Sequence, residues 1–135
     1  MTRPLHSSAV LRALLARHGV RADKGFGQNF LVDARVLADI LGAAEVGPKD
    51  TVLEVGPGPG VLTAALAERA GRVVAVELDA RMLAVLAETV GDRPNVEIIA
   101  GDALRYDLAT LPPDSLLVAN LPYNVGTPIV VRALE

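Results

Sequence analysis

Short apolar runs alternate with helical patterns between residues 51 and 119, and this alternation restricts the possible folds more than any other feature of the chain. Strands are predicted at residues 51–55, 73–76, 96–99 and 116–119, and helices at residues 61–70 and 80–90. Each predicted strand is nearly continuous apolar sequence, which is typical of parallel strands covered on both faces. The sequence therefore predicts an α/β fold with a doubly wound, mostly parallel sheet.

Two helices are predicted before this unit. Ser7 or Ser8 can cap the first, whose apolar residues recur at helical spacing up to a stop at Gly19. Asp33 can cap the second, which is expected to end near Gly42. We expect the first helix to pack against the main body of the protein.

A last helix is predicted after the fourth strand. Thr127 is a suitable N-cap, Pro128 is a suitable first helical residue, and residues 129–134 continue the apolar pattern toward the end of the chain. If the sheet stops at residues 116–119, that strand is a parallel edge without a partner. The expected consequence is poor solubility or edge-mediated self-association.

Composition excludes several classes of protein. The chain has 135 residues, 51% hydrophobic and 21% charged, so it is at most one globular domain, and a short one for a complete α/β enzyme. It has neither an apolar run of membrane-spanning length nor a signal-peptide pattern, so a soluble, cytoplasmic protein is expected. Zero cysteines exclude disulfides, and His6 and His18 lack partners at metal-ligand spacing, so no bound metal is expected. His18 is expected to interact with the last carbonyl groups of the first helix.

Charge is distributed unevenly along the chain. Residues 1–30 contain five Lys and Arg residues and one Asp, a net charge of +4. Because the whole chain carries −3, the remaining residues carry −7. A basic segment beside an acidic body is expected where a polyanion is bound at one edge, although an arginine-rich helix face exposed to solvent explains the pattern equally well.

Residues 56–60 have the sequence Gly-Pro-Gly-Pro-Gly and join the first predicted strand of the sheet to the helix that follows. Glycine-rich loops at this position bind dinucleotides, nucleoside triphosphates or S-adenosylmethionine. The dinucleotide pattern needs a glycine where Val61 stands, and the triphosphate pattern needs a lysine that this loop lacks. Pro57 and Pro59 also remove two backbone N–H donors that a phosphate cradle would use. The loop therefore favours a ligand without phosphate, such as S-adenosylmethionine, with a tight turn that binds nothing as the alternative.

Polar residues lie at the ends of all four predicted strands: Glu54, Glu77, Asp102 and Asn120. In a doubly wound sheet, ligands bind beyond the carboxyl ends of the strands. Glu77 stands 21 positions after Gly56 (77 − 56), close to the roughly 20 expected of an acidic residue that binds ribose hydroxyls in this architecture. Glu77 is therefore the predicted ribose ligand.

Two neighbouring acidic residues have alternative interpretations. Asp79 is a second candidate for the ribose, although its position just before a helical pattern favours an N-cap. Asp102 is suited to accept a hydrogen bond from the exocyclic amine of adenine, and a turn after Gly101 that its side chain stabilises is the alternative.

The stretch Asn120-Leu121-Pro122-Tyr123 follows the fourth predicted strand. The N6 amine of adenine needs acceptors that favour a nucleophilic geometry, because its lone pair is delocalised into the ring. The Asn120 amide oxygen and the Leu121 carbonyl can supply them, while Pro122 fixes the turn and Tyr123 offers a stacking face worth about 1–3 kcal/mol per base. Asparagine cannot take a proton, so positioning is the expected main contribution, with the proton lost to water after methyl transfer.

Five motifs in order carry a family resemblance: Gln28-Asn29-Phe30-Leu31, Glu54-Val55-Gly56-Pro57-Gly58-Pro59-Gly60, Glu77-Leu78-Asp79, Gly101-Asp102-Ala103 and Asn120-Leu121-Pro122-Tyr123-Asn124. From about Lys24 to Leu134, the chain resembles the N-terminal part of the small-subunit ribosomal RNA adenine dimethyltransferases, the KsgA family. It is also similar to the erythromycin-resistance RNA methyltransferases.

The resemblance implies a class I, Rossmann-like methyltransferase fold that uses S-adenosylmethionine. It implies N6,N6-dimethylation of two adjacent adenosines near the 3′ end of small-subunit ribosomal RNA, within ribosome biogenesis. The implied cofactor contacts are Gln28, Asn29, Leu31, Gly56, Gly58, Glu77, Asp102, Ala103 and Asn120. The implied catalytic residues are those of the Asn120 to Tyr123 stretch.

The resemblance also implies how the chain is divided. Residues 1–23 are expected to form a basic helical arm, and residues 24–135 an incomplete cofactor-binding part whose sheet is truncated after the fourth strand. Family members continue with further strands and a C-terminal helical domain that helps to bind RNA. The alternatives are a large-subunit RNA methyltransferase of the erythromycin-resistance type and a non-catalytic RNA-binding factor of ribosome assembly.

Overall fold

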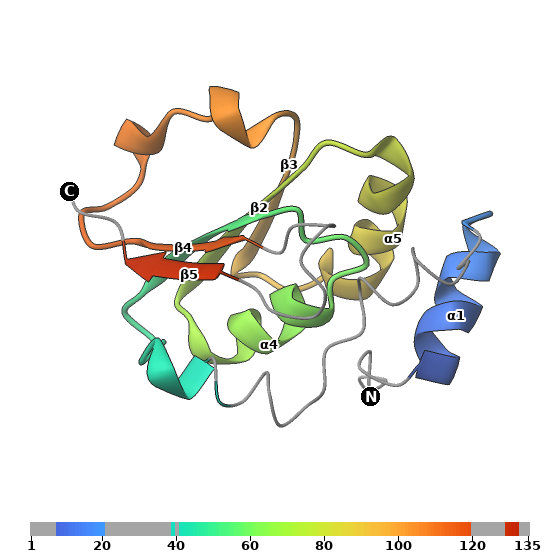
Figure 1. Ribbon diagram of the computed structural model, residues 1–135, viewed down its shortest axis with the longest axis horizontal. Helices are drawn as coiled ribbons and strands as arrows, with labels where there is room; N and C mark the ends of the chain where they lie inside the picture. The colour runs from blue at the N-terminus through green and yellow to red at the C-terminus, as the bar shows by residue number, and fades with distance from the viewer. Residues whose placement is uncertain (1–7, 21–38, 40, 120–128, 133–135) are drawn as a thin grey trace.

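The computed structural model describes residues 8–20, 39, 41–119 and 129–132, and all structural statements refer to these residues (Figure 1). They form one five-stranded sheet with the strand order β3-β2-β1-β4-β5. The strands are β1 (Thr51–Val55), β2 (Arg72–Glu77), β3 (Val96–Ala100), β4 (Leu116–Ala119) and β5 (Ile129–Arg132). The helices are α1 (Ser8–Arg17), α4 (Val61–Arg69) and α5 (Ala80–Val90), with short 3₁₀ turns η1 (Ala103–Arg105) and η2 (Leu108–Thr110).

The first four strands of the sheet are parallel, as the sequence predicts. β1 lies in the centre and pairs with β2 on one side and β4 on the other, while β3 pairs with β2. The chain leaves β1 toward β2 and β3 and then crosses back to β4, which is the doubly wound arrangement. The predicted fold class is therefore confirmed.

The fifth strand corrects the sequence-based prediction for the end of the chain. Ile129–Arg132 runs antiparallel to β4, with Ala119 opposite Ile129, where a helix was predicted. The β-branched residues of this segment favour a strand, and pairing along β4 outweighs the local helix signal from Thr127 and Pro128, which lie outside the described residues. The prediction that β4 is an edge without a partner is wrong, and with it the basis for edge-mediated self-association through β4.

Alternate side chains of the strands enter two apolar layers on opposite faces of the sheet. On one face, β1, β2 and β4 pack against α4, and β2 also packs against α5. On the other face, Leu53, Val74 and Val76 are covered by Ala103, Tyr106 and Leu111 of the η1–η2 segment. Figure 1 shows the sheet between α4 below and this segment above.

Helix α1 packs against the main body, as predicted. Leu11, Leu14 and Leu15 are buried in one cluster with Val61 of α4 and Met82 of α5, and Figure 1 shows α1 beside α5.

Two basic residues at the end of α1 pair with the body as well. Arg17 and His18 both contact the Glu88 carboxylate of α5, at 2.6 and 2.8 Å. The backbone N–H of His18 donates to the Leu15 carbonyl of α1 at 3.1 Å, as the position after this helix predicts, while the imidazole pairs with Glu88 of α5. This contact also lowers the pKa of Glu88.

The remaining boundaries agree closely with the predictions. Residues 41–43 are the end of the helix expected to stop near Gly42, while its predicted cap, Asp33, lies outside the described residues.

No helix in the described part of the chain is both long and apolar enough to cross a membrane.

Candidate functional site

The glycine loop between β1 and α4 has a backbone conformation that explains its composition. Gly56, Gly58 and Gly60 have φ angles of 69°, 56° and 93°, all in the left-handed region where side chains are strained. Gly60 also lies against α5, since a Cβ there would be 2.6 Å from Oγ1 of Thr89. Three glycines are therefore needed for the path of the chain.

The N–H groups of the loop are all used within the protein. Gly56 donates to the Val76 carbonyl at 3.1 Å, Gly60 donates to the Pro57 carbonyl at 3.1 Å, and Gly58 donates to the Glu77 carboxylate at 2.9 Å. The two prolines between them have no N–H. Residues 56–60 therefore offer no N–H donor to a phosphate, in agreement with the sequence-based exclusion of phosphate ligands.

Glu77 ends β2 and ties the loop to the start of α5. Its side chain is 7% exposed. One carboxylate oxygen accepts from Gly58 N and the other from Asp79 N, both at 2.9 Å. Because a carboxylate has about four acceptor positions, each oxygen keeps capacity for a ligand hydroxyl. The structure thus brings the predicted ribose ligand to the glycine loop, and it also shows a bridging role that sequence reasoning missed.

Asp79 is the N-cap of α5, as its position in the sequence favours. Its carboxylate accepts from Arg81 N at 2.9 Å and pairs with the Arg81 guanidinium at 3.0 Å. The hydrogen bond from Arg81 lowers the pKa of Asp79. Because its acceptors serve the helix, Asp79 is a weaker candidate than Glu77 for the ribose.

Asp102 stabilises a turn, which was the alternative interpretation of this residue. Its Oδ1 accepts from Leu104 N at 2.9 Å at the start of η1, and Ala103 packs on the apolar layer below. Gly101 N donates to the Glu77 carbonyl at 2.9 Å, so the chain reaches Asp102 directly beside the end of β2. The structure therefore places Asp102 and Glu77 at neighbouring strand ends.

Glu54 is the site residue to which sequence reasoning gave no role. It is fully buried at the end of β1, where Thr63 of α4 donates to its Oε1 at 2.5 Å. Its Oε2 is buried and has no hydrogen-bond partner among the described residues. Burial raises the pKa of Glu54 to about 8, and the charge of Glu77 acts in the same direction. An acidic residue inside an apolar strand, two positions before the loop, is the sequence signal that could have identified it.

Two groups of predicted site residues lie outside the described residues. They are Gln28, Asn29 and Leu31 near the N-terminus and the stretch from Asn120 to Tyr123. Ala119, which precedes that stretch, pairs with Val55, the residue before the glycine loop. In the described part of the chain, no group of three or more acidic or His side chains is placed to hold a metal ion.

The family of the chain follows from a comparison with protein-family models. The model described as Ribosomal RNA adenine dimethylase matches residues 19–135. The chain belongs to this family. The family resemblance seen in the five motifs is thereby confirmed.

Curated relatives in the ribosomal RNA adenine dimethylase family are similar along nearly the whole chain. The probable ribosomal RNA small subunit methyltransferase A of Methanopyrus kandleri is 45% identical over 133 residues, which cover 97% of this chain and 46% of that protein. Ribosomal RNA small subunit methyltransferase A of Deinococcus radiodurans is 46% identical over 132 residues, with 98% and 45% covered. The chain spans slightly less than half the length of these relatives.

Solved structures agree with the fold. The crystal structure of 23S rRNA methyltransferase ErmE is similar with a TM-score of 0.56 and 30% identity, over 67% of this chain and 47% of that one. A dimethyladenosine transferase from Plasmodium falciparum has a TM-score of 0.53 and 23% identity, over 65% of this chain and 42% of its own. The second likeness bears on the fold alone.

Proposed function

We propose that the protein binds S-adenosylmethionine at the glycine loop. The observation that carries this proposal is that every N–H of residues 56–60 is used internally, while the buried Glu77 carboxylate contacts the loop at Gly58 and the buried Glu54 stands two residues before the loop. Such a site suits a ligand with cationic groups and hydroxyls, and it is unsuited to phosphates. Glu77 binds the ribose hydroxyls, and the Asp102 oxygen that does not cap η1 accepts from the adenine amine.

The reaction proposed at this site is methyl transfer to N6 of adenosine in small-subunit ribosomal RNA, with two methyl groups added to each of two adjacent adenosines near the 3′ end. The bound cofactor supplies an electrophilic methyl group. Asn120 and the Leu121 carbonyl orient the adenine amine, Pro122 holds that turn, and Tyr123 stacks on the base. Gln28, Asn29 and Leu31 contact the cofactor from the N-terminal side. Family membership and the names of the curated relatives support this reaction.

Because its substrate is ribosomal RNA, we place the reaction in the cytoplasm, during ribosome assembly. Methylation of large-subunit RNA is the second candidate, because the ErmE structure is 30% identical. A factor of ribosome assembly that binds RNA without turnover is the third.

Two experiments test the proposal. Calorimetric titration of the chain with S-adenosylmethionine is expected to give saturable, one-to-one binding, and the absence of binding would contradict the cofactor assignment. Mapping of methylated adenosines on both ribosomal RNAs, in cells with and without the gene, is expected to show the loss of the small-subunit pair. Loss of a large-subunit methyl group instead would support the second candidate, and unchanged methylation the third.

A further inference from the structure

Among the described residues, the Glu54 carboxyl group has no partner that would compensate a buried negative charge. It is 0% exposed and accepts one hydrogen bond, from the neutral hydroxyl of Thr63. Its second oxygen has no hydrogen-bond partner in the described part of the chain. A buried carboxylate with one neutral donor is strongly disfavoured, so the group is held in its protonated form in the free protein.

The described strands and helix around Glu54 add no positive charge. The residues beside it on the neighbouring strands are Ala75 of β2 and Val118 of β4, both apolar. The charged residue that acts on it from β2 is Glu77, which is also acidic. Helix α4 presents Thr63, while its charged residues Glu68 and Arg69 lie at its far end and are exposed. Within the described residues, a negative charge on Glu54 would therefore have no positive group to compensate it.

We propose that Glu54 is the counter-charge of the cofactor site, which releases its proton when the cationic methyl donor binds and thereby favours that donor over its uncharged, demethylated product. This inference rests on the proposed function, because the positive sulfonium is the feature by which the donor differs from S-adenosylhomocysteine. Glu54 stands two residues before Gly56, in the end of β1 that leads into the glycine loop, and its carboxyl group contacts Thr63 of the helix that follows the loop.

The direction of the coupling follows from charge. A bound cation stabilises the carboxylate, so the pKa of Glu54 falls on binding from its free value of about 8. At pH values between the pKa of Glu54 in the complex and its pKa in the free protein, binding of the donor releases a proton. In this range the affinity for the donor increases with pH by up to about tenfold per pH unit. Above the free pKa the affinity no longer depends on Glu54. The uncharged product causes a smaller shift, so its affinity changes less with pH.

Proton release can be counted by calorimetry. The chain is titrated near pH 7 with S-adenosylmethionine and with S-adenosylhomocysteine, each in phosphate and in Tris, whose ionisation enthalpies differ. We expect the donor to release several tenths of a proton more than the product, because Glu54 is mostly protonated at about one unit below its pKa. The amino groups of the two ligands can contribute different numbers of protons, because the sulfonium lowers the pKa of the amine in the donor alone. This ligand contribution is the same in the unmodified chain and in a Glu54 variant, so comparing the two proteins subtracts it.

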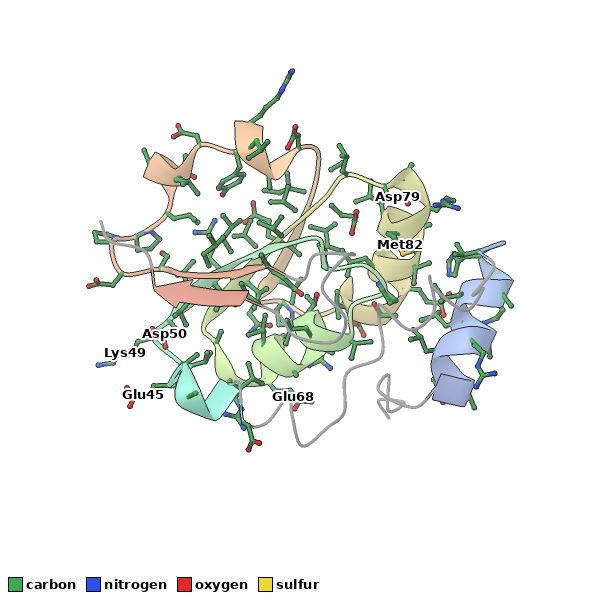
Figure 2. All side chains as sticks on the ribbon, viewed as in Figure 1. Glu45, Lys49, Asp50, Glu68, Asp79 and Met82 are labelled. Atoms are coloured by element: carbon green, nitrogen blue, oxygen red, sulfur yellow. The ribbon has the colours of Figure 1, made fainter. Side chains whose placement is uncertain are left out.

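Two variants assign the proton. In Glu54→Gln, which keeps the shape of the side chain, the difference between donor and product is expected to fall to the contribution of the ligand amino groups. The matched control is Glu68→Gln on the outer side of α4 (Figure 2), where the side chain is 66% exposed and the difference is expected to persist. If Glu54→Gln fails to fold, equal proton release by the two ligands on the unmodified chain would still overturn the inference.

The possible failures can be told apart. Binding of both ligands with equal proton release would overturn the role of Glu54 and leave the cofactor site intact. A difference that persists undiminished in Glu54→Gln would assign the proton to another group and overturn the inference as well. Absence of binding by either ligand would contradict the proposed function, and this inference with it.

Discussion

The Glu77 carboxylate accepts from the N–H groups of Gly58 and Asp79 at once, so a change at this residue acts on the loop and on the start of α5 together. Glu77→Gln keeps one acceptor oxygen and leaves one buried N–H without a partner, which is expected to cost about 1–3 kcal/mol in the free energy of unfolding. The affinity for S-adenosylmethionine is expected to fall by about tenfold or more, because ribose contacts to a charged acceptor are lost. Urea denaturation and calorimetric titration measure the two effects.

Asp79→Asn is the matched control for Glu77→Gln. Asparagine is as good an N-cap as aspartate, so α5 keeps its start while the ion pair with Arg81 is lost. Cofactor affinity is expected to stay within about twofold of the unmodified chain, since surface ion pairs contribute little. A Glu77→Gln chain that binds as tightly as Asp79→Asn would contradict the ribose assignment.

Asn120 carries the proposed orientation of the adenine amine. Asn120→Ala removes the amide oxygen, and methyl transfer is expected to fall by about 10²–10³-fold, the size of effect seen when one aligned polar group is removed from an active site. Incorporation of tritiated methyl groups into small ribosomal subunits measures it, with a thermal unfolding scan to show that the variant is folded. If incorporation survives the substitution, the catalytic assignment of this stretch is wrong.

At the scale of elements, the turn from β1 into α4 depends on both the conformation and the close packing of Gly60. Gly60→Ala places a Cβ 2.6 Å from Thr89 Oγ1 at a φ of 93°. It is expected to lower the free energy of unfolding by about 2–4 kcal/mol, as measured by urea denaturation. Gly19→Ala is the matched control, because Gly19 has a φ of 71° while a Cβ added there would meet no atom within 4 Å. It is expected to cost about 1 kcal/mol, the conformational part alone.

The double substitution Gly60→Ala with Thr89→Ala separates the two contributions further. Removing the Thr89 hydroxyl relieves the contact and leaves the strained φ, so partial recovery of stability is expected. The Thr89 hydroxyl also donates to the Pro59 carbonyl at 2.9 Å, so full recovery is not expected. Equal costs for Gly60→Ala and Gly19→Ala would show that packing against α5 contributes nothing.

Elements whose signal is local were predictable from the sequence, whereas those decided by distant partners were not. The apolar runs indicated β1 to β4, and the N-cap position of Asp79 indicated the start of α5, because each depends on neighbours in the chain. Segment 129–132 carries a helix cap signal before it and a β-branched composition within it. Pairing with β4 makes this segment a strand, and that long-range contact cannot be inferred from the local sequence.

The site was predictable to the extent that topology places it. The carboxyl ends of parallel strands meet at one edge, so Glu77 and Asp102 could be grouped by position alone. The hydrogen bonds of the Glu77 carboxylate and the orphaned oxygen of Glu54 depend on the spatial path of the loop. Neither follows from spacing, and both required the structure.

At the scale of the whole molecule, Glu54 makes stability depend on pH. Its pKa is raised from 4.5 to about 8, so between these values the folded chain holds a proton that the unfolded chain has released. The stabilisation is complete below the lower value and is lost as pH rises through the upper one, by up to about 1.4 kcal/mol per pH unit. Urea unfolding between about pH 5.5 and pH 7.5 is expected to show this fall in the unmodified chain.

The same measurements on Glu54→Gln provide the reference for that slope. Asp79 and Glu88 have lowered pKa values, so their contributions change below their ordinary values of 3.8 and 4.5 and do not fall in this window. The variant is therefore expected to be less dependent on pH between about 5.5 and 7.5. Parallel slopes for the two proteins would show that Glu54 is ionised throughout.

The glycine loop satisfies its own N–H groups without any ligand. A loop of this kind is preorganised: it loses its conformational entropy when the chain folds, so cofactor binding does not have to order it. Binding is then expected to show a heat capacity change that matches the burial of the ligand alone, with no contribution from coupled folding of residues 56–60. With these glycines and prolines, the loss of conformational entropy in residues 56–60 therefore accompanies folding and does not accompany cofactor binding.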